Sequence, residues 1–203
     1  MRTVVINALN LGKFHRYWLE HFQLRRRIFV ERLEWDLPED GDLEFDSFDT
    51  PAAHYVVALD EDDHVCALSR LVPTTSPYMI ETLWPEWPGP ACPKSPKIWE
   101  ATRFGCSAEL NAAQRKDAIS SLFRTIYEFG QNRDLDHFLM VMPQFIFERL
   151  IRRAGYDVDY IGDARKFDGV PTRLGRVNIA QAQMPHMPVL RPDYPATLLH
   201  HNA

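Results

Sequence analysis

Charged and aromatic side chains alternate in the segment LRRRIFVERLEW, residues 24–35. Arg25 and Phe29 are four residues apart, which places them on one face of a helix, and Trp35 follows where that helix should end. A guanidinium group can fork onto a carboxylate, and an aromatic ring can lie against a cation. The segment therefore suits a ligand that carries both charges. It equally suits a helix with a solvated arginine face and Phe29 in the core.

A second charged segment, EFDSFD at residues 44–49, carries Asp46 and Asp49 three residues apart in a loop. These carboxylates could orient an amino group, or they could simply be solvated. Paired carboxylates can also bind a metal ion, but no histidine is spaced as a further ligand. We therefore expect no metal site.

Two charged residues, Glu100 and Arg103, interrupt the strand-like segment at residues 97–106. Their burial requires partners, and strict alternation would place them on opposite faces of a sheet. A bulge near Gly105 would bring both to one pocket, whereas an edge strand with exposed charges is the alternative. In a buried cluster, three arginines could neutralise three carboxylates, namely Arg25, Arg70 and Arg103 against Asp46, Asp49 and Glu100.

The elements that must position these residues alternate between helical and strand periodicity. Helices are predicted at residues 12–33, 78–84, 112–130 and 145–155, the last ending at Gly155 as a C-cap. Strands are predicted at residues 3–7, 54–60, 65–74, 97–106, 137–142, 156–161 and 173–182. Interleaved elements of this kind favour a three-layer α/β/α sandwich around one mixed sheet. We expect a single domain over residues 1–183 and a proline-rich tail over residues 184–203.

The composition limits the classes of partner. The chain has 203 residues, a net charge of −5 and 45% hydrophobic residues, which is enough for one core. The negative charge argues against a nucleic-acid partner, and no apolar run reaches the roughly 18 residues of a membrane span. Three separated cysteines without a CxxC pair argue against a structural zinc site or a disulfide framework. We expect a cytoplasmic enzyme with no membrane partner, as a monomer or a weak dimer.

Taken in order, the charged and aromatic positions resemble the acyl-homoserine lactone synthases, or autoinducer synthases, of bacterial quorum sensing. The matching residues are Arg25, Phe29, Trp35, Asp46, Asp49, Arg70, Glu100 and Arg103. One departure is Trp84, which stands where the family usually has phenylalanine. The resemblance implies a fold similar to that of the N-acetyltransferases (GNAT-like). The Gly-x-Gly pyrophosphate loop of ordinary acetyltransferases is missing, which favours a synthase over an acetyl-coenzyme A enzyme.

The resemblance also implies the reaction and its residues. S-adenosylmethionine is a substrate rather than a cofactor, and a fatty acyl thioester is the donor. Amide formation precedes lactone closure, which releases methylthioadenosine. The implied catalytic residues are Glu100 as the base, with Asp46, Asp49 and Arg103. The implied S-adenosylmethionine-binding residues are Arg25, Phe29, Trp35, Arg70 and Phe104. Backbone N–H groups near Arg103 could meet the thioester oxyanion.

The acyl side is assigned on the same basis. The expected pocket residues are Met79, Trp84, Thr102, Val141, Met142 and Phe145, with Leu139 and Ile151 as further lining. Because residues 141–143 carry no side-chain hydroxyl, we expect an acyl chain unsubstituted at its third carbon. Three arginines on one predicted helix suit either a solvated face or a docking patch for acyl carrier protein or coenzyme A phosphates, namely Arg149, Arg152 and Arg153. The donor stays open between acyl carrier protein and acyl-coenzyme A.

Two other functions fit the same residues. One is an N-acyltransferase that acts on another amine and forms no lactone. The other is a non-catalytic protein that binds acyl thioesters or S-adenosylmethionine. Release of methylthioadenosine separates the synthase from the first, and turnover separates it from the second.

Overall fold

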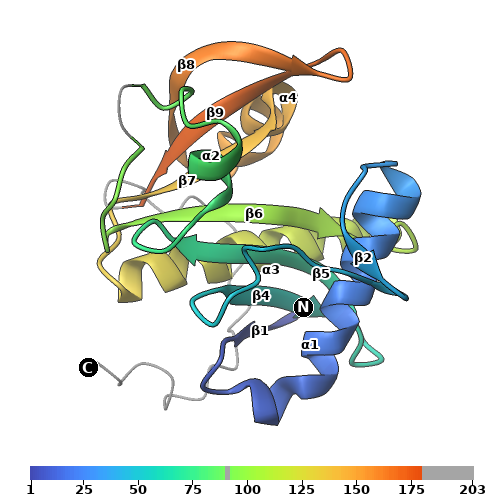
Figure 1. Cartoon of the computed structure of the whole chain (residues 1–203). Coiled ribbons are helices and arrows are strands. Elements are labelled where there is room, and N and C mark those ends of the chain that lie inside the picture. Colours follow the sequence, from blue (N-terminus) through green and yellow to red (C-terminus); the bar gives the residue numbers. More distant parts are fainter. Residues whose placement is uncertain (90–91, 180–203) are drawn as a thin grey trace. The chain divides into compact units, whose positions relative to one another are not determined.

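The computed structural model describes residues 1–89 and 92–179 (Figure 1). The predicted tail, residues 184–203, lies outside the described residues, so both the tail and the single domain over residues 1–183 stay predictions. The described chain divides into two compact units. The first consists of Met1–Arg70 with Arg103–Glu128. The second consists of Leu71–Thr102 with Phe129–Pro188, the latter described as far as residue 179.

The first unit contains β1, β4 and parts of β5 and β6, in the strand order β1-β4-β5-β6. Their bounds are β1 Arg2–Ile6, β4 His54–Leu59, β5 Val65–Pro73 and β6 Ile98–Cys106. β1 pairs antiparallel with β4, with Thr3 opposite Ala58 and Ile6 opposite Tyr55. Residues 55–59 of β4 are all buried. A strand buried on both faces must be covered on both sides.

Helices α1 (Leu11–Arg25) and α3 (Ala112–Asn132) cover the two faces. The His21 ring of α1 lies 4.4 Å from the Tyr55 ring. The Thr3 hydroxyl of β1, which shares the face of Ala58, lies 2.7 Å from the Thr125 hydroxyl of α3. Because Tyr55 and Ala58 are three residues apart on one strand, they point to opposite faces. The first unit is therefore layered helix, sheet, helix, as predicted (Figure 1).

The predicted helix at residues 12–33 changes its winding halfway. α1 ends at Arg25, and η1 (Arg26–Arg32) continues as a π-helix, closed by a 3.1 Å hydrogen bond from the amide of Leu33 to the carbonyl of Ile28. A π-helix has a wider turn than an α-helix. The predicted helix is thus present as an α-helix that is followed by a π-helix.

A small hairpin follows η1 in the acidic segment. β2 (Glu39–Asp40) pairs antiparallel with β3 (Leu43–Glu44). Gly41 turns the chain between them with φ = 62°, a conformation that glycine adopts without strain. β2 is exposed, whereas Glu44 at the end of β3 is fully buried.

The second unit contains the strand order β6-β7-β9-β8, with bounds β7 His137–Pro143, β8 Asp157–Phe167 and β9 Val170–Asn178. β6 and β7 are parallel, whereas β9 is antiparallel to both β7 and β8. The mixed sheet confirms the predicted α/β fold. The β8–β9 hairpin is longer than predicted, because it continues through an irregularity between Ile161 and Arg165 into a charged, exposed segment. Residues 180–182 of the predicted last strand lie outside the described residues.

Short helices complete this unit. α2 (Met79–Leu83) follows β5, and α4 (Gln144–Ile146) passes into the π-helix η2 (Phe147–Ile151) after β7. The predicted helix at residues 145–155 therefore winds more widely than an α-helix for half its length. Gly155 has φ = 88°, which confirms the left-handed residue predicted after the helix.

Candidate functional site

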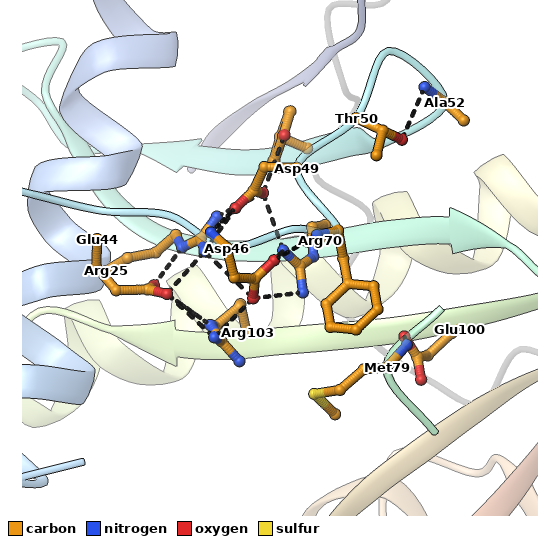
Figure 2. A network of polar contacts seen from close by, with 12 residues as sticks. Arg25, Glu44, Asp46, Asp49, Thr50, Ala52, Arg70, Met79, Glu100 and Arg103 are labelled. Carbon is orange, nitrogen blue, oxygen red and sulfur yellow. Dashed lines mark hydrogen bonds and ion pairs between the residues drawn. The ribbon is translucent and has the colours of Figure 1, made fainter. Parts of the chain in front are cut away.

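Three arginines and three carboxylates form a buried network in the first unit, which we call the ion cluster: Arg25, Glu44, Asp46, Asp49, Arg70 and Arg103 (Figure 2). The charges of the six side chains sum to zero, and this pairing of opposite charges lowers the free-energy cost of burying them. The side chains of Arg25, Glu44 and Arg70 are 0% exposed, and the most accessible one, Asp46, is only 9% exposed.

Arg25, the last residue of α1, joins two of the carboxylates. Its Nε and Nη2 donate to the two oxygens of Glu44 at 2.6 and 3.0 Å. Its Nη1 and Nη2 donate to the two oxygens of Asp49 at 2.7 and 2.9 Å. Such paired, charge-assisted hydrogen bonds fix the relative orientation of the groups. Arg25 therefore braces the acidic segment against the helix end.

The other two arginines come from the sheet. Arg70 of β5 donates to both oxygens of Asp46 at 2.5 and 3.1 Å, and its Nη1 lies 2.9 Å from Asp49 Oδ1. Arg103 of β6 donates to Glu44 Oε1 at 3.0 Å and to Asp46 Oδ2 at 2.8 Å. Every carboxylate in the cluster thus contacts at least two arginines.

Glu44 was not singled out in the sequence. The expected third carboxylate was Glu100, whereas the carboxylate that bridges Arg25 and Arg103 is Glu44. A usable signal existed, because Glu44 precedes Asp46 by two residues and an extended chain points such residues to the same side. Because many neighbouring residues of the segment are also acidic, Glu44 could not be distinguished from them in the sequence.

Both carboxylate oxygens of Asp49 accept hydrogen bonds from several protein donors. Its oxygens accept hydrogen bonds from Arg25, from the Asp46 amide at 2.8 Å and from the Tyr55 hydroxyl at 3.0 Å. Burial alone would raise the pKa of the Asp49 carboxyl, but the charges of Arg70 and Arg25 outweigh it and hold that pKa below its usual value. Asp49 is therefore ionised and already occupied by protein donors.

Two aromatic rings lie against different arginines of the ion cluster. Arg25 lies over the Phe22 ring at 5.0 Å, whereas Arg103 lies over Phe29 at 5.6 Å. Phe29 stacks on Trp35 at 5.1 Å, and Trp35 is 43% exposed. A line of contacts therefore leads from the surface at Trp35 to Arg103.

The irregularity expected in the strand at residues 97–106 lies at Arg103. This residue has φ = 52°, a left-handed conformation that is rare for a residue with a side chain. Such a residue breaks the alternation of side chains along β6. Gly105, two residues on, allows close packing of η1, since a Cβ atom there would lie 3.0 Å from the Ile28 side chain.

Two neighbours of Arg103 have other surroundings. Phe104, expected to contact S-adenosylmethionine, is half-buried and stacks on Phe123 of α3 at 4.9 Å. Thr102, expected in the acyl pocket, is 6% exposed and belongs to the second unit. The structure thus gives Phe104 a packing partner that the sequence pattern did not indicate.

Glu100 belongs to the second unit and is fully buried. Its Oε2 accepts a hydrogen bond from the Met79 amide at 3.0 Å (Figure 2). Its Oε1 accepts one from the Ile80 amide at 2.7 Å. The first amides of a helix have no partner within the helix, so a carboxylate from a strand can cap them. Glu100 therefore fixes the start of α2.

The expected acyl-pocket residues of the second unit differ in exposure. Met79, Trp84, Val141 and Met142 are half-buried, and Phe145 is 51% exposed. The further lining residues, Leu139 and Ile151, are 0% exposed and belong to the core. Trp84 packs edge-on against Trp87 and Phe167 at 5.8 and 5.3 Å.

The three arginines of the expected docking patch, Arg149, Arg152 and Arg153, are all exposed. Arg152 is partly engaged within its own unit: it donates to the Val158 carbonyl at 2.6 Å and lies 3.6 Å from Glu148. The predicted α-helical spacing of the three does not hold, because Arg149 lies in η2 and the other two follow its end.

His21 of α1 is a buried titratable group beside the ion cluster. It is 0% exposed, its ring lies 3.9 Å from the Phe22 ring, and its nitrogens have no hydrogen-bond partner among the described residues. Burial, and then the charge of Arg25, lowers the pKa of His21 to about 3. The imidazole is therefore neutral at pH 7.

This low pKa predicts an acid-sensitive stability. In the unfolded chain a histidine has a pKa of about 6.5, so between pH 6.5 and about 3 only the unfolded chain binds the proton. The contribution of His21 is fully present above pH 6.5 and falls by up to about 1.4 kcal/mol per pH unit below it. In urea unfolding at pH 7, 6 and 5, a His21→Leu variant should lose less unfolding free energy than the wild type as the pH falls.

A control variant, His15→Gln, changes an exposed histidine and should follow the wild type. If the free energy of unfolding falls equally with pH in all three proteins, the low pKa of His21 is contradicted.

In residues 1–89 and 92–179, no group of three or more histidine, cysteine, aspartate or glutamate side chains is arranged to hold a metal ion. None of the helices in these residues combines the length and hydrophobicity that a membrane span requires.

Comparisons with known proteins agree with this geometry. The family model described as autoinducer synthase matches residues 13–187. The acyl-homoserine-lactone synthase of Aeromonas hydrophila is 34% identical over 154 residues, which cover 73% of each chain. The solved structure of a CoA-dependent acyl-homoserine lactone synthase, BjaI, with SAM and isopentyl-CoA has a TM-score of 0.79 and 27% identity, covering 89% of this chain and 84% of that one.

A more distant likeness concerns the fold alone. An acyl-CoA N-acyltransferase from Pseudomonas aeruginosa has a TM-score of 0.55 at 16% identity, covering 87% of this chain and 97% of that one. The fold is thus the GNAT-like fold of the N-acyltransferases. The ion cluster and the matches narrow this class: the chain belongs to the autoinducer synthase family and is an acyltransferase of the acyl-homoserine-lactone synthase type.

Proposed function

We propose that this synthase couples a fatty acyl thioester to S-adenosylmethionine and closes the product to a lactone. The α-amino nitrogen attacks the thioester carbonyl carbon, a C–N bond forms, and the C–S bond breaks. The thiol leaves, and the proton of the amine is removed. The carboxylate oxygen then attacks the γ-carbon, whose bond to the sulfonium sulfur breaks. Methylthioadenosine leaves as a neutral thioether, so S-adenosylmethionine is consumed as a substrate.

The ion cluster supports a division of roles on the S-adenosylmethionine side. Asp46 and Arg103 are its most exposed carboxylate and arginine, at 9% and 6%. We assign them to the amino-acid end of the substrate, with Trp35 and Phe29 packing on its sulfonium and adenine side. Arg25, Arg70 and Asp49 then act as braces that hold Asp46 and Arg103 in place.

Glu100 is the proposed general base. The attacking amine must be neutral, whereas a free α-amino group has a pKa of about 7.7–8, so a base speeds the reaction near neutral pH. Because both Glu100 oxygens already accept backbone amides, we propose that it removes the proton through a water molecule.

The acyl donor is proposed to be acyl-coenzyme A or acyl carrier protein. The related BjaI structure contains isopentyl-CoA, which supports the first. The exposed Arg149 and Arg153 suit either the phosphates of coenzyme A or the acidic surface of a carrier protein. Binding to either should weaken as the salt concentration rises.

One observation carries the proposal: a neutral, buried cluster of three arginines and three carboxylates is linked to the exposed Trp35 by the contacts of the Phe29 ring. The test is incubation of the protein with S-adenosylmethionine and a panel of acyl-coenzyme A and acyl-carrier-protein donors, followed by mass spectrometry. We expect an acyl-homoserine lactone and methylthioadenosine in equal amounts with at least one donor. No lactone with any donor would refute the proposal.

The same experiment separates the two rivals. An N-acyltransferase would acylate a different amine in a mixed panel and release no methylthioadenosine. A non-catalytic binder would form no product, although a calorimetric titration would show that it binds S-adenosylmethionine.

The acyl pocket allows a prediction on donor choice. Met142 of β7 is half-buried and has no hydroxyl group. In a Met142→Thr variant the hydroxyl could donate to an oxygen on the third acyl carbon, which is worth about fivefold in kcat/KM. Competition between a 3-oxo donor and its unsubstituted counterpart should shift toward the 3-oxo product. A Met142→Val variant, without the hydroxyl, is the matched control, and equal product ratios in both variants would contradict the assignment.

A further inference from the structure

Tyr55 of β4 contacts the ion cluster at Asp49. Its hydroxyl donates to Asp49 Oδ1 at 3.0 Å, and the residue is 5% exposed. Its ring is held by neighbours on α1, with the His21 ring at 4.4 Å and the Phe22 ring at 5.8 Å. Both burial and the charge of Asp49 raise the pKa of this hydroxyl above its usual value, so it remains a donor.

The Tyr55 donor differs from the other side-chain donors to Asp49. Arg25 also donates to Glu44, and Arg70 also donates to Asp46, so each arginine divides its hydrogen bonds between two carboxylates. A phenol hydroxyl has a single hydrogen to give. Tyr55 reaches Asp49 from the buried strand β4, whereas Arg25 reaches it from the end of α1. Tyr55 therefore adds a third side-chain contact to the paired bonds of Arg25 and restrains the Asp49 carboxylate at Oδ1.

Asp49 passes this direction on to Asp46. Its Oδ2 accepts the Asp46 amide at 2.8 Å, and the Asp49 amide in turn donates to the Asp46 carbonyl at 3.1 Å. Asp46 is the cluster carboxylate with the largest exposed fraction. A tilt of the Asp49 carboxylate would thus move the backbone that carries Asp46.

We propose that Tyr55 is a positioning residue for S-adenosylmethionine, acting through Asp49 on Asp46. This inference rests on the proposed function of the cluster and adds a residue that does not itself touch the substrate. The hydroxyl group carries the effect. The ring and its contacts with His21 and Phe22 serve the packing, and these stay in place in a Tyr55→Phe variant.

The test is steady-state kinetics of Tyr55→Phe with both substrates varied. We expect the KM for S-adenosylmethionine to rise about fivefold or more, with the KM for the acyl donor and kcat within about twofold of the wild type. A role in folding alone would lower kcat through the active fraction and leave both KM values unchanged, which would overturn the proposal. An unchanged KM for S-adenosylmethionine would overturn it as well.

The control is Tyr17→Phe, which removes another tyrosine-to-aspartate hydrogen bond of the same unit, from Tyr17 to Asp63 at 2.6 Å on the surface. It should behave as wild type. In an Asp49→Ala background, which removes the acceptor of the Tyr55 hydroxyl, Tyr55→Phe should raise the KM no further, because the two changes act on one hydrogen bond. A full, additive increase would contradict the route through Asp49. If the wild type itself makes no lactone, the proposed function fails, an outcome distinct from a silent Tyr55→Phe.

Discussion

A Glu44→Gln variant should lose about 3 kcal/mol of unfolding free energy and at least about 100-fold in kcat/KM. Glutamine has nearly the same shape as glutamate but places an NH2 group against guanidinium donors. Arg25 and Arg103 would then share one excess positive charge in a site where Glu44 is 0% exposed. Urea unfolding measures the first loss and lactone formation the second.

The matched control is Glu39→Gln in the same hairpin. Glu39 accepts a hydrogen bond from Arg26 at 2.7 Å but is exposed, so water replaces the lost partner. Its stability and activity should equal those of the wild type. Equal behaviour of the two variants would mean that the ion cluster contributes nothing beyond ordinary surface ion pairs.

A Glu100→Gln variant should lose at least about 100-fold in kcat, because a positioned general base contributes about 10²–10⁴-fold. The variant should also be less stable, because the side-chain NH2 of glutamine cannot accept a hydrogen bond. Either the Met79 or the Ile80 backbone amide then loses its acceptor. Unfolding curves establish that the protein is folded at the assay temperature. Single-turnover lactone formation then measures the chemical step.

A second glutamate of the same unit provides the comparison. Glu81 lies in α2 and pairs with Lys94 at 2.5 Å at the surface. Glu81→Gln should keep the activity of the wild type. A folded Glu100→Gln enzyme with full activity would reduce Glu100 to a helix cap and would remove it from the catalytic residues.

The order of elements could be predicted because periodicity and turn residues are local properties. The pattern of Ala118, Leu122 and Ile126 indicated α3, and these residues are buried in the structure. The start of η1 could not be predicted in this way, since α- and π-helices have similar residue preferences. The contact of Arg103 with the Phe29 ring could not be predicted either, because it joins residues that are far apart in the sequence.

The site could be predicted in part. Five members of the ion cluster stood out as charged residues in apolar or aromatic surroundings, and the structure joins them. Glu44 and Tyr55 did not stand out, because their importance comes from what they contact in the fold. A glutamate in an acidic segment and a tyrosine in a strand are ordinary in sequence. Only the hydrogen bonds of Glu44 to Arg25 and of Tyr55 to Asp49 distinguish them.

The assignment of the ion cluster to S-adenosylmethionine is tested most directly by a crystal structure of the protein with that substrate bound. We predict that its amino-acid end lies within hydrogen-bonding distance of Asp46 or Arg103, with Trp35 against its sulfonium or adenine group. Occupancy at a place that touches none of these three residues would contradict the account.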